Sequence, residues 1–116
     1  MDYHVILLGR AAEFIHSLPE KLEAKSLRAI NLLRQFGYAL REPHSKTLKG
    51  IDGLKELRIQ VGTDICRLFY FHFKDMVYVV TSGYVKKEQK TSKDEIERAL
   101  RIMDEFLKEQ NHDKNS

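Results

Sequence analysis

The sequence has only one cysteine and two prolines among its 116 residues. A single cysteine cannot form an internal disulfide, so Cys66 is expected to be a buried thiol of a protein in the reducing cytosol. No Cys/His signature surrounds it, which argues against a catalytic cysteine. The five histidines show no metal-ligand spacing, so we expect no metal site and no cofactor.

The sequence also lacks a long hydrophobic run. Its N-terminal segment, MDYHVILLGRAAEF, has only a short apolar stretch between charged residues. This is unlike a signal peptide or a membrane span, so we expect a cytoplasmic protein with no membrane partner. Repeats and low-complexity tracts are absent as well. A chain of this length is expected to fold as one domain around a single core.

The charge is mildly basic. The net charge is +3 and the isoelectric point is about 9.0, which permits contact with phosphate but is far below the charge of a histone-like protein. Between residues 84 and 93 four lysines stand against a single acid, Glu88: Lys86, Lys87, Lys90 and Lys93. This run is either part of a basic patch or a solvated loop that leads into a helix.

The strand signals are concentrated in the middle of the chain. From residue 56 to 61 apolar and polar side chains alternate, which is typical of a strand with one buried face. After turn residues 62–64, the run Ile65–Phe73 is apolar on both parities, as in a central strand covered on both faces. Met76–Val85 is a third run of β-branched and aromatic residues. The sequence predicts an antiparallel meander of three strands.

Helical patterns flank this meander. Tyr3–Leu8 indicates a first strand, and two helices follow it, meeting at Pro19 and ending at Gly37. Residues 38–53 indicate a loop with a short strand at Thr47–Leu48. Together with a last helix, the pattern predicts an α+β protein with the order β-α-α-β-β-β-α. Its antiparallel-rich sheet is packed by an N-terminal helical hairpin and a C-terminal helix.

The C-terminal helix begins with either Thr91 as its N-cap or Ser92, which forms a capping box with Glu95. An apolar stripe from Ile96 to Leu107 is expected to pack on the sheet. We therefore expect one domain over residues 1–108. The polar residues 109–116 have nothing to bury and are expected to fray.

These residues resemble the RelE/HigB toxins of bacterial type II toxin–antitoxin pairs, the RelE/ParE superfamily. The resemblance covers about Tyr3 to Leu107. It rests on KTLKGIDGLKELRI, on the arginine of ICRLFYF, and on GYVKKEQKTSKDEIERA. Ser92 departs from the pattern, because many relatives have proline at the first helical position, but this difference concerns only helix capping.

The resemblance implies a ribosome-dependent, metal-independent endoribonuclease that cleaves translated mRNA and is neutralised by a cognate helix-turn-helix antitoxin. The 2′-hydroxyl attacks the adjacent phosphate, so the protein must assist proton removal, stabilise the phosphoryl oxygens and protonate the leaving 5′ oxygen. Clustered basic side chains suit these roles, because neighbouring positive charges lower a lysine pKa. The alternatives are a ParE-like DNA gyrase inhibitor, which needs no catalytic cluster, and an inactive module that only binds an antitoxin.

Carried over residue by residue, the resemblance implies these catalytic residues: Arg58, Arg67, Lys86 and Lys87. Candidate RNA-binding residues lie just before the meander and at or after the end of its last strand: Lys49, Lys55, Tyr84 and Lys90. Tyr84 either stacks on a base or closes the core at the end of its strand. The competing role for the arginines is in surface ion pairs, of Arg58 with Glu56 or a loop acid and of Arg67 with Asp64.

The register of the meander decides whether the arginines meet. If the turn at Gly62 is a four-residue loop, Arg58 lies directly opposite Arg67, and a pairing of Phe73 with Met76 places Ser82 on the other side of Arg67. Two opposed like charges destabilise a sheet and are easier to explain as a phosphate site.

Two further expectations concern the central strand. His72 is expected to be a hydrogen-bonded core histidine. The aromatic residues around it are expected to belong to the core: Phe69, Tyr70, Phe71 and Phe73.

Overall fold

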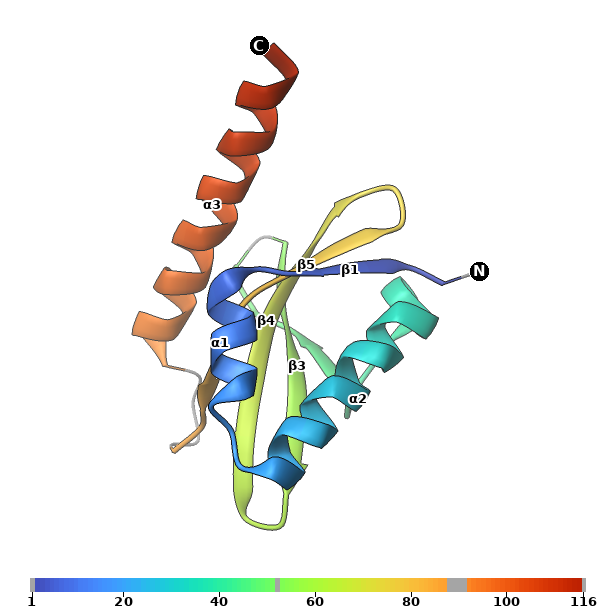
Figure 1. Cartoon of the computed structure of the whole chain (residues 1–116), viewed down its shortest axis with the longest axis vertical. Helices are drawn as coiled ribbons and strands as arrows, with labels where there is room; N and C mark the ends of the chain where they lie inside the picture. Colours follow the sequence, from blue (N-terminus) through green and yellow to red (C-terminus); the bar gives the residue numbers. More distant parts are fainter. Residues whose placement is uncertain (1, 52, 88–91, 116) are drawn as a thin grey trace.

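The computed structural model describes residues 2–51, 53–87 and 92–115, with the backbone alone for residues 112–115. Figure 1 shows α1 and α2 in front of the sheet and the long α3 beside it. The elements follow one another in this order: β1 (His4–Leu7), α1 (Gly9–His16), α2 (Glu20–Phe36), the 3-10 turn η1 (Gly37–Ala39), β2 (Ser45–Thr47), β3 (Leu54–Val61), β4 (Asp64–Lys74), β5 (Val77–Val85) and α3 (Lys93–Asn115). The predicted α+β class and element order are confirmed, and β2 is the short strand expected in the loop before the meander.

The five strands form one sheet in the order β1-β5-β4-β3-β2. The meander of β3, β4 and β5 is antiparallel, as predicted, and β2 adds an antiparallel edge to β3. β1 pairs in parallel with β5, with His4 opposite Val77 and Leu7 opposite Val80. Strand β2 lies at Ser45–Thr47 instead of the predicted Thr47–Leu48, because Leu48 turns into the core and is only 7% exposed.

The helices α1 and α2 cover one side of the sheet, which we call the α1–α2 face. Pro19 is the N-cap of α2, and Gly37 ends it with a positive φ of 51°. Only glycine suits this cap, because the Tyr3 ring packs where a β-carbon would lie. The main core lies on this face and includes these buried residues: Ala11, Ile15, Leu22, Ile30, Leu33, Leu57, Ile59, Cys66, Leu68, Tyr70, Tyr78 and Val80. Cys66 is fully buried, as predicted.

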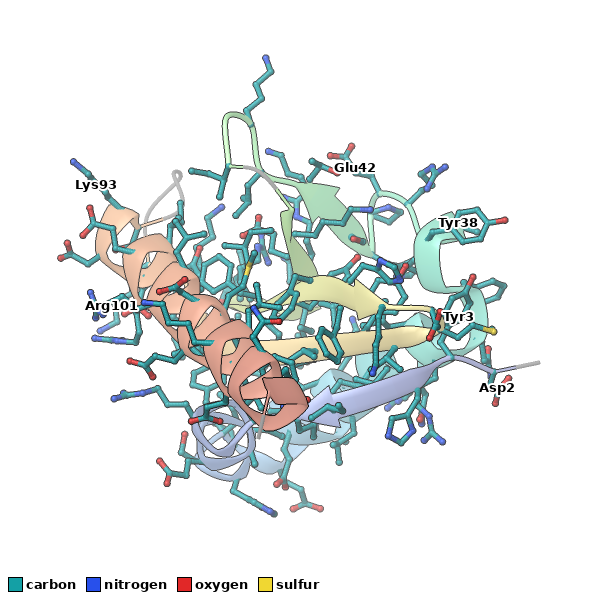
Figure 2. The ribbon with its side chains drawn as sticks, turned by 90° about the horizontal axis from the view of Figure 1, so that it is seen from above. Asp2, Tyr3, Tyr38, Glu42, Lys93 and Arg101 are labelled. Carbon is teal, nitrogen blue, oxygen red and sulfur yellow. The ribbon has the colours of Figure 1, made fainter. Side chains whose placement is uncertain are left out.

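The other side of the sheet, the α3 face, packs against the C-terminal helix. Its core contains Leu54, Phe69, Tyr84 and Ala99, with Met103 packed against them. Seen from above in Figure 2, α3 crosses the sheet, and its first residue, Lys93, lies at the far end of the molecule from Tyr3 and Tyr38. Among the helices of the described residues, none is long and apolar enough to cross a membrane.

The two ends of α3 concern the expected N-cap and the expected fraying of the C-terminal residues. The helix begins at Lys93, and the carbonyl of Ser92 accepts a hydrogen bond from the Ile96 N–H. Ser92 therefore occupies the N-cap position, while Thr91 lies outside the described residues. The backbone of α3 is helical to Asn115, and the fraying expected from Glu109 onward stays a prediction.

The expectation of a hydrogen-bonded core histidine at His72 is confirmed for the hydrogen bond and wrong for the core position. His72 is hydrogen-bonded, with a ring nitrogen 2.7 Å from the carbonyl of Asp75, but its side chain is exposed. The pairing of β4 with β5 shifts between His72 and Lys74, at the end of the covered part of the strand. The predicted core aromatics are buried at positions 69, 70 and 71, while Phe73 is half-buried and packs edge-on against Phe106.

Candidate functional site

The predicted pairing of the two arginines is confirmed. Arg58 on β3 lies directly opposite Arg67 on β4, and the strands are joined by a tight turn in which Gly62 has a positive φ of 61°. The residue on the other side of Arg67 is Tyr84, and the prediction of Ser82 there is wrong. Two register shifts cause the difference, one between Phe69 and Tyr70 and one near the β4–β5 turn. Such irregularities leave no periodic signal in a sequence.

Arg67 is held in place by its surroundings. Its side chain is almost fully buried, Nη1 donates a hydrogen bond of 3.1 Å to the carbonyl of Cys66, and Nε lies 3.7 Å from Oε1 of Glu56. The ion-pair partner of Arg67 is therefore Glu56 and not the predicted Asp64. The sequence-based alternative offers Glu56 as a partner of Arg58. Within the described part of the chain, the buried Nε of Arg67 has no hydrogen-bond partner. A buried guanidinium N–H without an acceptor is suited to an incoming anion.

The charges around Arg67 act on its pKa in opposite directions. Burial lowers the pKa of Arg67 first, the positive charge of Arg58 lowers it further, and the carboxylate of Glu56 raises it. An arginine nevertheless stays protonated at any physiological pH. The result is a fixed positive charge in a site with reduced access to water, where a charge–charge interaction is stronger than in bulk solvent.

Lys86 lies next to this pair. Its backbone N–H donates a hydrogen bond of 2.8 Å to the carbonyl of Ile65, which extends the β4–β5 ladder past the end of β5. Burial lowers the pKa of the Lys86 amine, and the charges of Arg67, Arg58 and Lys46 lower it further, while Glu56 opposes them. A lysine with a lowered pKa is populated in its neutral, basic form more readily than an isolated one.

A basic hollow opens beside the arginines. It has a volume of about 320 Å³ and lies along the part of β3 that β2 does not cover, since β2 pairs only with residues 55–57. Its described lining residues include no carboxylate and are as follows: Lys25, Pro43, His44, Arg58, Gln60 and Arg67. The His44 carbonyl accepts a hydrogen bond from the Arg58 N–H, and the Lys25 amine donates one to the Gln60 carbonyl. Three cationic side chains therefore line a space large enough for a phosphate group.

The structure separates some of the predicted residues from this group. Lys55 lies on the α1–α2 face, because its strand partner is the core residue Tyr70. Lys49 is exposed in the turn after β2, and Lys87 is exposed beside Lys86. Lys90 lies outside the described residues.

For Tyr84 the structure favours the core role over base stacking. The ring is 8% exposed and stacks on Phe69 with ring centroids 5.5 Å apart. Its strand position nevertheless places it directly opposite Arg67. Tyr84 therefore closes the core beneath the arginines.

Three residues of this site had no functional role in the sequence-based prediction: Lys25, His44 and Glu56. Lys46 lies directly opposite Glu56, and strand alternation places both on the face that carries Arg58. The alternation was therefore a usable signal for Glu56, because a strand predicted to expose polar residues at 56 and 58 places both on one face. Lys25 and His44 come from α2 and a loop, and no sequence pattern links them to β3.

This arrangement has the parts of an anion site with acid–base capacity. Two opposed guanidinium groups can bind and stabilise a phosphate, and a neighbouring amine with a lowered pKa can exchange a proton. Among the described residues, no group of three or more His, Cys, Asp and Glu side chains is arranged to hold a metal ion.

Comparisons with a protein family and with solved structures agree with this fold. Residues 13–104 match the family model described as phage derived protein Gp49-like (DUF891). The toxin RelE of E. coli in its free state, a mutant with two arginines replaced by alanine, has a TM-score of 0.61 and 18% identity, over 87% of this chain and 97% of its own. No curated protein matches the chain.

Two complexes show the same likeness. RelE in the intact E. coli RelBE toxin–antitoxin complex has a TM-score of 0.56 and 16% identity over 74% of this chain and 99% of its own. A chain of the archaeal RelE–RelB complex from Pyrococcus horikoshii has a TM-score of 0.52 and 21% identity, over 78% of this chain and all of its own. The predicted likeness to RelE is thus confirmed for the fold, and the chain belongs to the phage derived protein Gp49-like family.

Proposed function

We propose that this protein is the toxin of a type II toxin–antitoxin pair and cleaves translated mRNA on the ribosome without a metal ion. The observation that carries the proposal is the direct opposition of Arg58 and Arg67, with the lowered pKa of Lys86 beside them. Two opposed like charges cost the sheet stability, and a bound phosphate would offset this cost. The similarity to RelE, which two of the matching structures contain in complex with RelB, supports a toxin with an antitoxin partner.

The chemistry divides among the basic residues. In its neutral form the Lys86 amine accepts the proton of the attacking 2′-hydroxyl, whose oxygen then forms a bond to phosphorus. Arg58 and Arg67 stabilise the charge that develops on the phosphoryl oxygens. The bond from phosphorus to the 5′ oxygen breaks, and that oxygen takes a proton from an ammonium group, for which the exposed Lys87 is the candidate. The products are a 2′,3′-cyclic phosphate and a 5′-hydroxyl.

The partners follow from this role. The ribosome presents the message in the cytoplasm, and the exposed Lys46 and Lys49 extend the positive surface along β2 and the turn after it. Lys90 remains a proposed RNA contact of the segment outside the described residues. A cognate helix-turn-helix antitoxin would neutralise the toxin by laying an acidic or amphipathic segment across Arg58 and Arg67.

The test is brief expression of the chain followed by mapping of mRNA 5′ ends. New 5′ ends inside translated codons are expected from the wild type and not from Lys86→Arg, whose guanidinium cannot act as a neutral base. Growth arrest by both proteins without new mRNA ends would overturn the proposal in favour of the ParE-like gyrase inhibitor. Absence of any growth effect would favour the inactive antitoxin-binding module.

A further inference from the structure

A fully buried carboxylate lies within the basic cluster. Glu56 is 1% exposed, and its Oε1 atom lies 3.7 Å from Nε of Arg67. It stands directly opposite Lys46 and two residues before Arg58 on the same face of β3. Glutamate is almost never fully buried unless its charge is paired, so a glutamate at this position requires the neighbouring positive charges.

The charges that face Lys86 come from each of the strands beside it. Lys46 of β2, Arg58 of β3 and Arg67 of β4 are positive, and Glu56 of β3 is the acid that acts on the Lys86 amine. On the α3 face the helix contributes apolar side chains to the core next to this cluster. Without Glu56, a buried guanidinium would face two further cations with no counter-charge among the groups that act on Lys86.

We propose that Glu56 is the positioning residue of this site: its buried carboxylate holds the Arg67 guanidinium in place and supplies the negative charge against which Lys46, Arg58 and Lys86 are kept together. The inference rests on the proposed cleavage function for its kinetic consequence, but its electrostatic part concerns the free protein. Glu56 is not a catalytic residue, because it does not line the basic hollow in which the phosphate is proposed to bind, whereas Arg67 does.

The first experiment reads the electrostatic role without any RNA. The titration of the Lys86 amine is followed by NMR in lysine-labelled protein, with Lys86→Arg assigning the signal. Removal of the negative charge in Glu56→Gln is expected to move the Lys86 midpoint to lower pH. The matched control is Glu13→Gln, an exposed glutamate of α1 on the other side of the sheet, which should leave the midpoint unchanged. A folded Glu56→Gln protein with a wild-type Lys86 midpoint would overturn the proposal.

The second variant, Glu56→Asp, keeps the charge but withdraws the carboxylate by one methylene group, and it carries the test if Glu56→Gln does not fold. Exchange of the Arg67 Nη1–H that is hydrogen-bonded to the Cys66 carbonyl should accelerate by about tenfold or more, because the carboxylate that holds the guanidinium in place is withdrawn. An unchanged exchange rate would contradict the positioning role.

The kinetic consequence is measured on ribosome-bound message. Glu56→Asp is expected to slow single-turnover cleavage by roughly ten- to a hundredfold with little change in KM, since a misplaced Arg67 stabilises the transition state less well. Cleavage at the wild-type rate would also overturn the proposal. If the wild-type protein does not cleave at all, the proposed function fails, while the two NMR measurements still decide the role of Glu56.

Discussion

Arg58 and Arg67 lie directly opposite each other on neighbouring antiparallel strands, on the face of the sheet that also carries Glu56. A like-charged pair in this position destabilises a sheet, whereas cross-strand pairs of opposite charge stabilise it. The carboxylate of Glu56 compensates the positive charge of Arg67, the buried member of the pair. Arg58 is half-buried and lines the basic hollow, whose described lining residues include no carboxylate. The folded protein thus keeps an excess positive charge where an RNA phosphate is proposed to bind.

The first prediction separates the function of Arg58 from its effect on stability. Arg58→Gln removes the repulsion with Arg67, so the free energy of unfolding should stay equal or rise by about 0.2–1 kcal/mol. Single-turnover cleavage should slow by about a hundredfold, which corresponds to about 2.7 kcal/mol of transition-state stabilisation. Urea unfolding and cleavage of ribosome-bound message measure the two effects.

The control for Arg58 is Arg10→Gln, which removes an exposed arginine of α1 on the other side of the sheet. It should change neither quantity. A clear loss of stability in Arg58→Gln would mean that this arginine is a structural residue.

The second prediction concerns the buried ion pair. Arg67→Ala leaves the carboxylate of Glu56 buried without its guanidinium partner, so the free energy of unfolding should fall by about 3–5 kcal/mol. The double variant Glu56→Leu/Arg67→Met replaces both charges with apolar side chains of similar size and should recover most of this loss. Urea unfolding of the single and double variants tests the coupling. Losses that simply add would show that the two side chains do not interact.

The third prediction is a pH dependence of cleavage. The pKa of Lys86 is lowered in the folded protein, so the neutral amine is populated at a lower pH than in an isolated lysine. If Lys86 is the general base, the cleavage rate should rise with pH through this lowered pKa and then level off. Rate–pH profiles of the wild type and Lys86→Arg test it, and the variant should lose the rising limb. Lys55→Arg, on the α1–α2 face, is the control, and a limb that survives in Lys86→Arg would assign the base to another group.

The fourth prediction uses the two faces of the sheet. Lys46 shares a face with Glu56 and Arg58, whereas Lys55 lies on the α1–α2 face. If Lys46 contacts a phosphate, Lys46→Gln should reduce the slope of log affinity against log salt by about one unit, as measured by ribosome binding. Lys55→Gln should leave the slope unchanged. A reduced slope in Lys55→Gln alone would place the RNA on the other face.

The sequence by itself determined the order of the elements and the meeting of the two arginines. Periodicity of two marks β3, and turn residues between it and β4 leave little freedom in how the strands pair, so Arg58 opposite Arg67 followed from local chemistry. Pro19 and Gly37 likewise set the ends of α2 through backbone restrictions that act within a few residues. These features depend on interactions along the chain or across one tight turn.

Only the tertiary structure decided which side chains share the site. The register shifts of β4 against β5 exchanged Ser82 for Tyr84 beside Arg67, and packing against Phe69 buried the Tyr84 ring. Lys25 of α2 reaches the Gln60 carbonyl of β3. The carboxylate of Glu56 is buried beside Arg67, and no local pattern predicts this burial. Irregular pairing, burial and contacts between distant segments depend on how all the layers pack together, and no local pattern in the sequence carries that information.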